Sequence, residues 1–261
     1  MRKVISALTI CVTALALLPA DASADEDDGY GKSDWPLSLV QRPLVLAPGM
    51  LEIRGDTVRV NLSKGAALEP ISLAPDVFIG VAKGLAIGIT HDTGICLTGA
   101  EGGCAKVYND VGLEAQYSLM GRGSFQLAAT GGASSSSLSS PFVAGLNLGF
   151  IVRLRLGKFA VEARPRLYVG VIERETRADS ADIPVDLQYQ VNTQTAVILE
   201  TGISGTLDDF GGDNRIPVGL AALFAINEKL DFGAAFRLTN VAGTDGGIDG
   251  RELAAHIRVR L

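Results

Sequence analysis

The stretch that decides the fold is Leu146–Val171, LNLGFIVRLRLGKFAVEARPRLYVGV. In its first part, Leu146–Leu156, every second residue is leucine, phenylalanine or valine, and arginine occupies two of the positions between them. After Gly157-Lys158 the alternation resumes over Val161–Val171. A period of two residues indicates β-strands. An arginine that faces lipid at the middle of a bilayer costs about 2–4 kcal/mol, so we expect the arginine faces to point inward.

The connections between such alternating segments are sorted by length. The short connections are residues 82–84, 120–123, 157–158, 192–195 and 227–229. The long ones are residues 63–69, 92–106, 131–141, 173–183, 208–214 and 242–250. Turns that alternate with loops put all turns at one end of the molecule. The sequence therefore predicts an all-β, closed, antiparallel up-and-down transmembrane barrel of twelve strands, with short periplasmic turns and long extracellular loops.

A soluble β-sandwich or a lipocalin-like barrel is the alternative, because alternation alone does not tell which face is wet. A soluble fold would turn its charges outward, and its connections would not be sorted by length. The strands also match the ~9–11 residues that a tilted transmembrane strand needs. These points favour the membrane barrel.

The start of the chain has the layout of an export signal. Arg2-Lys3 precedes an apolar run, Val4–Leu18, and Ala22-Ser23-Ala24 provides a cleavage site. The alternative is a retained transmembrane helix, but the run is shorter than the ~20 residues that spanning requires. We expect residues 1–24 to be cleaved, residues 25–48 to form a periplasmic extension, and residues 49–261 to form the barrel.

The composition excludes some partners. The chain has 23 basic against 29 acidic residues, a net charge of −6. An acidic chain is a poor partner for nucleic acid. The expected partners are instead outer-membrane lipid and lipopolysaccharide, and the expected location is the bacterial outer membrane.

Two cysteines, Cys96 and Cys104, fall in the same predicted loop. Export places them in an oxidising compartment, which favours a disulfide. Closing so short a loop would contribute about 2.5 kcal/mol by restricting the unfolded chain. Two free thiols, or half of a metal site, are the alternatives. No metal or cofactor site is predicted.

The lumen decides whether a twelve-strand barrel conducts, because its width lies between filled and channel-forming barrels. The residues expected to line it are Glu114, Arg153, Arg155, Glu162, Arg164, Arg166, Asp186, Glu200, Arg237, His256, Arg258 and Arg260. One interpretation is a salt-bridged interior that fills the barrel. The other is a basic ladder of Arg153, Arg155, Arg164 and Arg166 that favours anions. The first is favoured, since half-buried arginines usually find a carboxylate.

From Leu44 to Leu261 the chain resembles porin-like outer-membrane β-barrel proteins of Gram-negative bacteria, in particular an uncharacterised group of them. The resemblance is carried by SLAPDVFIGVAKGLAIGITH (72–91), VYNDVGLEAQYSL (107–119) and RIPVGLAALFAINEKLDFGAAFRLTN (215–240). It implies location, fold and insertion by the barrel-assembly machinery, and it brings no catalytic residue. Many such barrels end in an aromatic residue, whereas this chain ends in Arg260-Leu261.

The first functional hypothesis is a passive porin-like channel or small-solute transporter. The alternative is a closed structural or surface-interaction barrel whose loops do the work. A lipid-acting outer-membrane enzyme is the third possibility, for which only His91 and His256 could serve as an imidazole base and no clear serine partner is evident. We therefore predict that the chain is not an enzyme.

Overall fold

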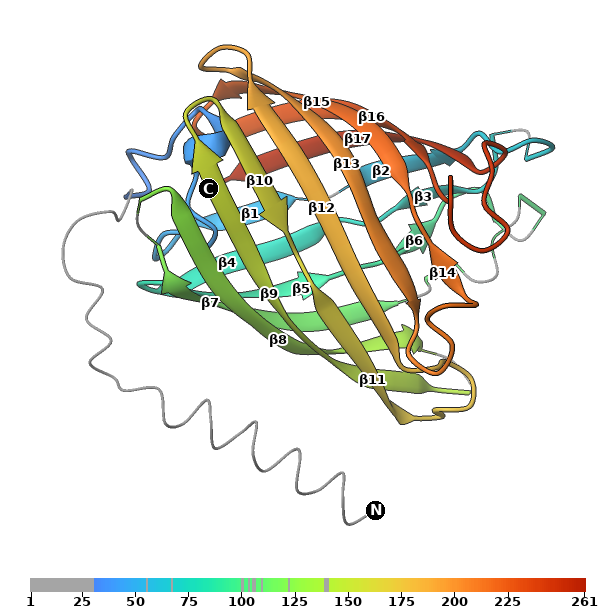
Figure 1. Cartoon of the computed structure of the whole chain (residues 1–261). Coiled ribbons are helices and arrows are strands. Elements are labelled where there is room, and N and C mark those ends of the chain that lie inside the picture. The colour runs from blue at the N-terminus through green and yellow to red at the C-terminus, as the bar shows by residue number, and fades with distance from the viewer. Residues whose placement is uncertain are drawn as a thin grey trace.

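The computed structural model describes residues 31–261, apart from residues 55, 67, 100, 103, 105, 106, 109, 122, 139 and 140. The predicted export signal lies outside the described residues. The described chain is a β-barrel with one short 3-10 helix, η1 (Leu39–Gln41) (Figure 1). No helix in this part of the chain is long and apolar enough to cross a membrane.

The wall of the barrel is built from seventeen strand segments of the described chain. They are β1 (Leu51–Arg54), β2 (Asp56–Asn61), β3 (Ile71–Leu73), β4 (Asp76–Ala82), β5 (Leu85–Thr90), β6 (Ile95–Cys96), β7 (Val111–Met120), β8 (Phe125–Ser137), β9 (Val143–Leu156), β10 (Phe159–Ala163), β11 (Arg166–Ile172), β12 (Ser180–Gln190), β13 (Thr195–Thr206), β14 (Asn214–Arg215), β15 (Val218–Asn227), β16 (Leu230–Leu238) and β17 (Arg251–Arg260).

The seventeen segments make up twelve wall strands, because five of the wall strands are each divided into two segments by an interruption. Three interruptions fall at Pro75, Pro165 and Pro217, which lack the N–H that a strand donates to its neighbour. Segments β10 and β11, for example, both pair with β9 and with β12. Neighbours pair antiparallel, and β17 pairs with β1 and β2, which closes the ring. The prediction of a closed twelve-strand antiparallel barrel is confirmed.

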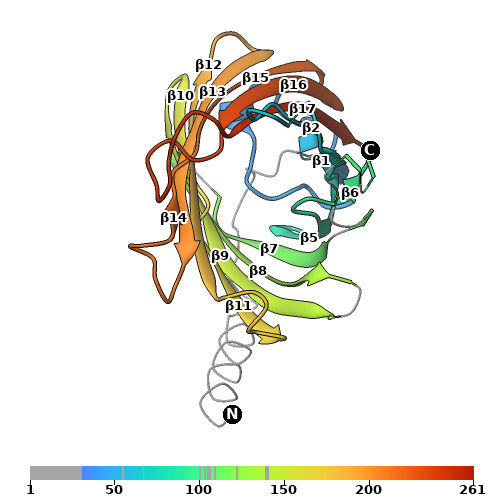
Figure 2. The ribbon, with the colours of Figure 1, turned by 90° about the vertical axis from the view of Figure 1, so that its right-hand side faces the viewer.

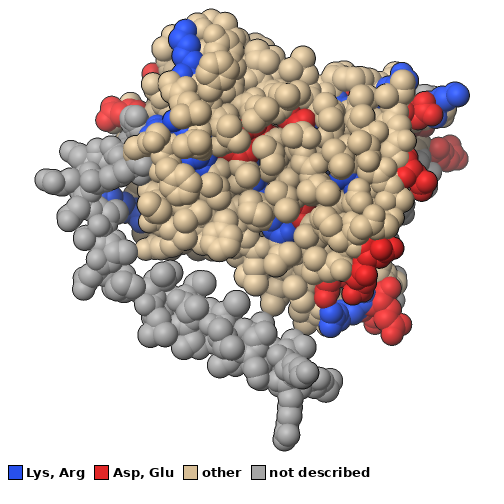
Figure 3. Space-filling view, viewed as in Figure 1, with Lys and Arg blue, Asp and Glu red and all other residues tan. Residues whose placement is uncertain are grey.

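The faces of the strands follow the predicted phase. On β9, Phe150 points outward and is 48% exposed, whereas its neighbour Ile151 is buried. Outward leucines on β7 and β15, Leu113 and Leu220, are similarly exposed. Figure 3 shows that most of one face of the wall is uncharged, while acidic side chains gather at the loop end. An apolar belt on the outside of a closed barrel matches the hydrocarbon core of a membrane.

Two strands run further toward the loop end than the sequence predicts. Strand β8 continues to Ser137, through part of the predicted loop 131–141. Gly131 and Gly132 stay in the sheet, since they pair with Leu148 of β9 and Glu114 of β7. Strand β12 likewise begins at Ser180, inside the predicted loop 173–183.

The N-terminal segment, residues 31–50, packs inside the barrel at the tight-turn end. Figure 2, which looks at the loop end, shows this segment in blue crossing the inside of the ring. The sequence predicts a periplasmic extension that leads into the barrel for residues 25–48; the described part of it lies against the inner face of the wall. Apolar side chains explain this position: Trp35, Leu46 and Met50 are buried against Phe78 and other inward residues of β4, β5, β8 and β9. Small inward side chains leave the space that the segment fills.

Gly80 marks the point where the segment comes closest to the wall. A Cβ atom on Gly80 would lie 2.0 Å from the carbonyl oxygen of Ala47. The backbone N–H of Gly49 donates a 2.8 Å hydrogen bond to the carbonyl of Gly80. Only glycine allows this approach of two backbones.

Candidate functional site

The candidate site is the lumen, a cavity of about 1090 Å³ that extends from the loop end to the N-terminal segment. Asp92 and Arg177 line it at the loop end, and Trp35 and Arg42 line it at the tight-turn end. Eleven of the twelve residues predicted from the sequence lie on its lining: Glu114, Arg153, Glu162, Arg164, Arg166, Asp186, Glu200, Arg237, His256, Arg258 and Arg260.

Arg155 is the exception among the predicted residues. It lies at the tight-turn end of β9, where its Nε donates a 3.0 Å hydrogen bond to the carbonyl of Gly123 in the neighbouring turn. The side chain is therefore used to fix a turn, and it does not line the cavity. Three arginines of the predicted ladder remain on the lining.

Each of these three arginines has a carboxylate partner. Arg153 donates from Nε to Glu162 at 2.7 Å, and Arg164 donates from Nε to the other oxygen of Glu162 at 2.7 Å. Arg164 also contacts Asp186. Strand register brings these groups together, since Glu162 of β10 lies opposite Arg153 of β9 on one side and Asp186 of β12 on the other.

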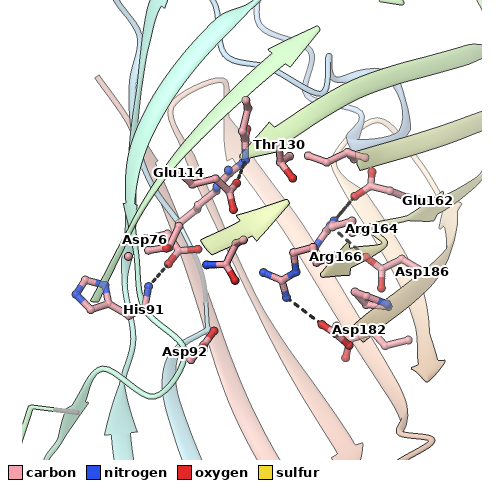
Figure 4. A pocket seen from close by; sticks show the side chains of 18 of the residues that line it. Asp76, His91, Asp92, Glu114, Thr130, Glu162, Arg164, Arg166, Asp182 and Asp186 are labelled. Carbon is pink, nitrogen blue, oxygen red and sulfur yellow. Dashed lines mark hydrogen bonds and ion pairs between the residues drawn. The ribbon is translucent and has the colours of Figure 1, made fainter. Parts of the chain in front are cut away.

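The pairs differ in how far they face the cavity. The side chain of Arg153 is 7% exposed, whereas that of Arg164 is 45% exposed. Arg166 is exposed to a similar degree and pairs with Asp182 at 3.0 Å (Figure 4). Arg164 and Arg166 are therefore in contact with the lumen, while Arg153 belongs to the wall.

A second cluster adjoins the first on the same part of the wall, since Glu200 of β13 lies in register with Asp186 of β12. Arg237 of β16 donates to Glu200 of β13 at 2.5 Å and to Glu252 of β17 at 3.2 Å. Strand β15 lies between β13 and β16, and its residue at this level is Gly219. A Cβ there would lie 2.8 Å from Glu200 and 2.9 Å from Arg237. The glycine thus leaves room for the ion pair to reach across one strand.

At the tight-turn end the N-terminal segment adds residues that the sequence analysis did not assign to the site. Arg42 binds Asp231 of β16 through Nη1 at 2.6 Å and Nη2 at 2.9 Å. Arg260 binds the same carboxylate at 2.6 Å and also Glu52 of β1 at 2.6 Å. The main-chain carbonyl of Arg42 accepts a 2.5 Å hydrogen bond from Arg153. A single arginine inside the apolar stretch PLSLVQRPLVL is a sequence signal that could have indicated this contact.

The wall formed by β4, β5 and β7 carries carboxylates. Figure 4 shows Asp76, His91 and Glu114 on one side of the cavity, with Arg164 and Arg166 on the other. The ring nitrogens of His91 lie 2.6 Å from the carbonyl oxygen of Pro75 and 2.8 Å from the hydroxyl of Tyr108. Both nitrogens are engaged, so His91 is not placed to activate a serine.

Asp110 fixes the loop that carries His91. The backbone N–H groups of Asp92 and Thr93 donate to its carboxylate at 2.6 and 2.9 Å, and the Thr93 hydroxyl donates as well. Burial raises the pKa of Asp110, but these hydrogen bonds outweigh burial and hold the pKa below its ordinary value. The carboxylate therefore stays ionised at neutral pH and orders the rim of the cavity.

The same region holds the two cysteines. Cys96 and Cys104 are joined by a disulfide, with their Cα atoms 5.9 Å apart. Within the described chain, no group of three or more His, Cys, Asp or Glu side chains is arranged to hold a metal ion.

No protein-family model and no curated protein matches the sequence. Solved structures of similar shape include porins. The NanC porin is 10% identical, with 80% of this chain and 98% of that chain covered and a TM-score of 0.54. The KdgM porin is 9% identical, with the same coverage and a TM-score of 0.56. The KdgM porin in complex with disordered oligogalacturonate is 11% identical, with 81% and 97% covered and a TM-score of 0.52. These likenesses show that the chain has the barrel fold of the porins.

Proposed function

We propose that this protein is a porin-like channel of the outer membrane that admits small solutes into a lumen lined by arginine–carboxylate pairs. The observation that carries the proposal is the cavity of about 1090 Å³ inside a closed barrel whose outer face is apolar. Half-exposed charged side chains such as Arg164 and Arg166 keep such a lumen wet. The barrel would be surrounded by outer-membrane lipid and lipopolysaccharide and inserted by the barrel-assembly machinery.

The N-terminal segment narrows the path at the tight-turn end. It is held there by the Arg42–Asp231 pair and by apolar contacts of Trp35, Leu46 and Met50. Solute passage would then depend on how much room this segment leaves beside it. In this proposal the lumen-exposed arginines Arg164 and Arg166, with their carboxylate partners, act on passing ions, while the N-terminal segment sets the conductance.

A second candidate function is a closed barrel that acts through its loops. One observation favours it, namely the filling of the tight-turn end by the N-terminal segment. The two candidates give opposite results when the purified barrel is placed between two salt solutions.

Planar-bilayer recording of the full-length mature chain separates the two. A channel gives stepwise current increments whose size increases with salt concentration. A folded barrel that stays electrically silent, also after the N-terminal anchor Arg42 is changed to methionine, would overturn the channel proposal and support the second candidate. Folding is checked in each sample by heat-dependent mobility on a gel, which closed barrels show and unfolded chains do not.

A further inference from the structure

The tight-turn end of the lumen carries more positive than negative charge. Four guanidinium groups surround two carboxylates in what we call the floor cluster, which consists of Arg42, Glu52, Arg54, Asp231, Arg258 and Arg260. The next carboxylate is Asp76, which lies in register with Arg54. Counting Asp76 still leaves four positive groups against three negative ones.

The excess positive charge of the floor cluster is assigned to Arg258. This residue of β17 lines the cavity and lies in register with Asp231 of β16. Arg42 and Arg260 both use Asp231, and Arg260 also uses Glu52. No hydrogen bond or ion pair joins the guanidinium of Arg258 to another residue in the described part of the chain. Arg258 therefore has all five of its N–H donors available.

A second unused donor lies beside the same cluster. The indole of Trp35 is only 4% exposed, and its Nε1 has no hydrogen-bond acceptor. The ring lies 5.7 Å from the guanidinium carbon of Arg260, and Trp35 also lines the cavity. A buried N–H without an acceptor costs free energy, as does a partly buried charge without a counter-charge. The cost at Arg258, whose guanidinium lines the cavity, is removed by an oxygen that carries negative charge.

We propose that the floor of the lumen is a binding site for a small anion with carboxylate or phosphate oxygens, held by Arg258, with the indole of Trp35 in the lining of the same cavity. The charge excess of the floor cluster draws the anion inward, and the planar guanidinium of Arg258 offers it two parallel hydrogen bonds. The site stands on its own geometry. The anion site does not require that the barrel conducts. A binding experiment therefore tests the anion site, and a conductance experiment tests the channel proposal.

The chain supplies its own probe, because Trp35 is its only tryptophan. The full-length mature protein, folded in detergent micelles, is titrated with inorganic phosphate, with acetate and with chloride at constant ionic strength. We expect Trp35 emission to change with saturation for phosphate or for acetate, and the comparison tells which oxygen chemistry the site prefers. Calorimetry on the same samples measures binding independently of the fluorescence.

Arg258→Gln should weaken binding by about tenfold or more, since a hydrogen bond to a charged group is lost. Arg258→Lys keeps the charge without the planar fork and should give an intermediate loss; it also serves if Arg258→Gln fails to fold. Arg155→Gln is the matched control, because it removes the same charge at the same end of the barrel outside the cavity. Its dissociation constant should stay within about twofold of the parent.

Two results would overturn the inference. One is a response that rises linearly with both phosphate and acetate, without saturation in either measurement. The other is an equal weakening by Arg258→Gln and Arg155→Gln, which would mean that overall charge attracts anions without a site. A conducting barrel with no saturable binding would refute the anion site and leave the channel proposal intact.

Discussion

Arg42 of the N-terminal segment donates two hydrogen bonds to Asp231 of β16, at 2.6 and 2.9 Å, across 189 residues of chain. Both side chains are almost completely buried, with 5% and 2% of their surface exposed. Asp231 also binds Arg260, the penultimate residue. The first and last parts of the described barrel are thereby fastened to each other through one carboxylate.

Arg42→Met tests this anchor. Removing one member of a buried ion pair leaves the other uncompensated, so we expect a loss of on the order of 3 kcal/mol in the free energy of unfolding. The freed segment should also leave a wider path, and the single-channel conductance should rise. Urea unfolding in lipid vesicles and planar-bilayer recording measure the two effects.

Arg174→Met is the control for this prediction. Arg174 pairs with Asp179 in the loop between β11 and β12, and 56% of its side chain is exposed. An exposed pair contributes at most about 1 kcal/mol, so stability should change little and conductance should not change. Equal effects of the two substitutions would show that Arg42 is no anchor.

Gly80→Ala tests the contact between the N-terminal segment and the wall. The added Cβ would lie 2.0 Å from the Ala47 carbonyl oxygen, so one backbone has to move. We expect a loss of about 1–3 kcal/mol in unfolding free energy, typical of overpacking. Gly131→Ala is the matched control on β8, because the nearest atom to its Cβ would be Leu148 Cδ2 at 3.7 Å. If both variants melt at the same temperature, the close approach at Gly80 does not matter for stability.

The sequence was sufficient to predict the barrel, because each strand of a membrane barrel alternates apolar residues that face lipid with polar residues that face the lumen. Alternation along Leu146–Leu156 sets the inward and outward faces, and the cost of an arginine in lipid decides which is which. The strand ends were harder to predict. Glycines and serines of β8, such as Gly131 and Ser135, carry no apolar signal, and only their pairing with β7 and β9 reveals them as strand.

The candidate site was predictable to the extent that it lies on regular strands. Alternation places Arg153, Arg164 and Arg258 on the lumen face, but it cannot tell which carboxylate each one meets. The partners come from register between strands, as with Glu162 opposite Arg153. The N-terminal segment has no period at all, so its position inside the barrel, and with it Arg42, depends on long-range packing that periodicity does not record.

Cys96→Ser combined with Cys104→Ser tests the disulfide. The two residues are separated by 8 positions, and a loop of this length contributes about 2.5 kcal/mol when closed. Because the loop lies at the rim, we expect its local protection from hydrogen exchange to fall while the wall strands stay protected. A reducing agent should produce the same change in the parent and none in the double variant. Unchanged exchange on reduction would contradict a stabilising disulfide.

The pH dependence of the rim should depend on Asp110. Its folded-state pKa lies below the unfolded value, because the Thr93 hydroxyl and neighbouring N–H groups outweigh the effect of burial. The stabilisation is therefore present above about pH 4 and is lost as the pH falls through the lowered folded-state pKa. Hydrogen exchange of the amides of Asp92 and Thr93 from pH 6 to pH 3 measures this loss. Asp110→Asn should exchange fast throughout; slow exchange in that variant would exclude a role for the charge.

Arg164 and Arg153 share one carboxylate, Glu162, but should act on different properties. Arg164 is half-exposed to the lumen, so Arg164→Gln leaves Glu162 and Asp186 with less positive charge and should shift ion preference toward cations. Arg153 is buried and also binds the carbonyl of Arg42, so Arg153→Gln should instead lower stability, by on the order of 3 kcal/mol. Reversal potentials in a potassium chloride gradient and urea unfolding measure the two properties. A larger shift in reversal potential for Arg153→Gln than for Arg164→Gln would refute this division, because a wall residue would then be the one that passing ions meet.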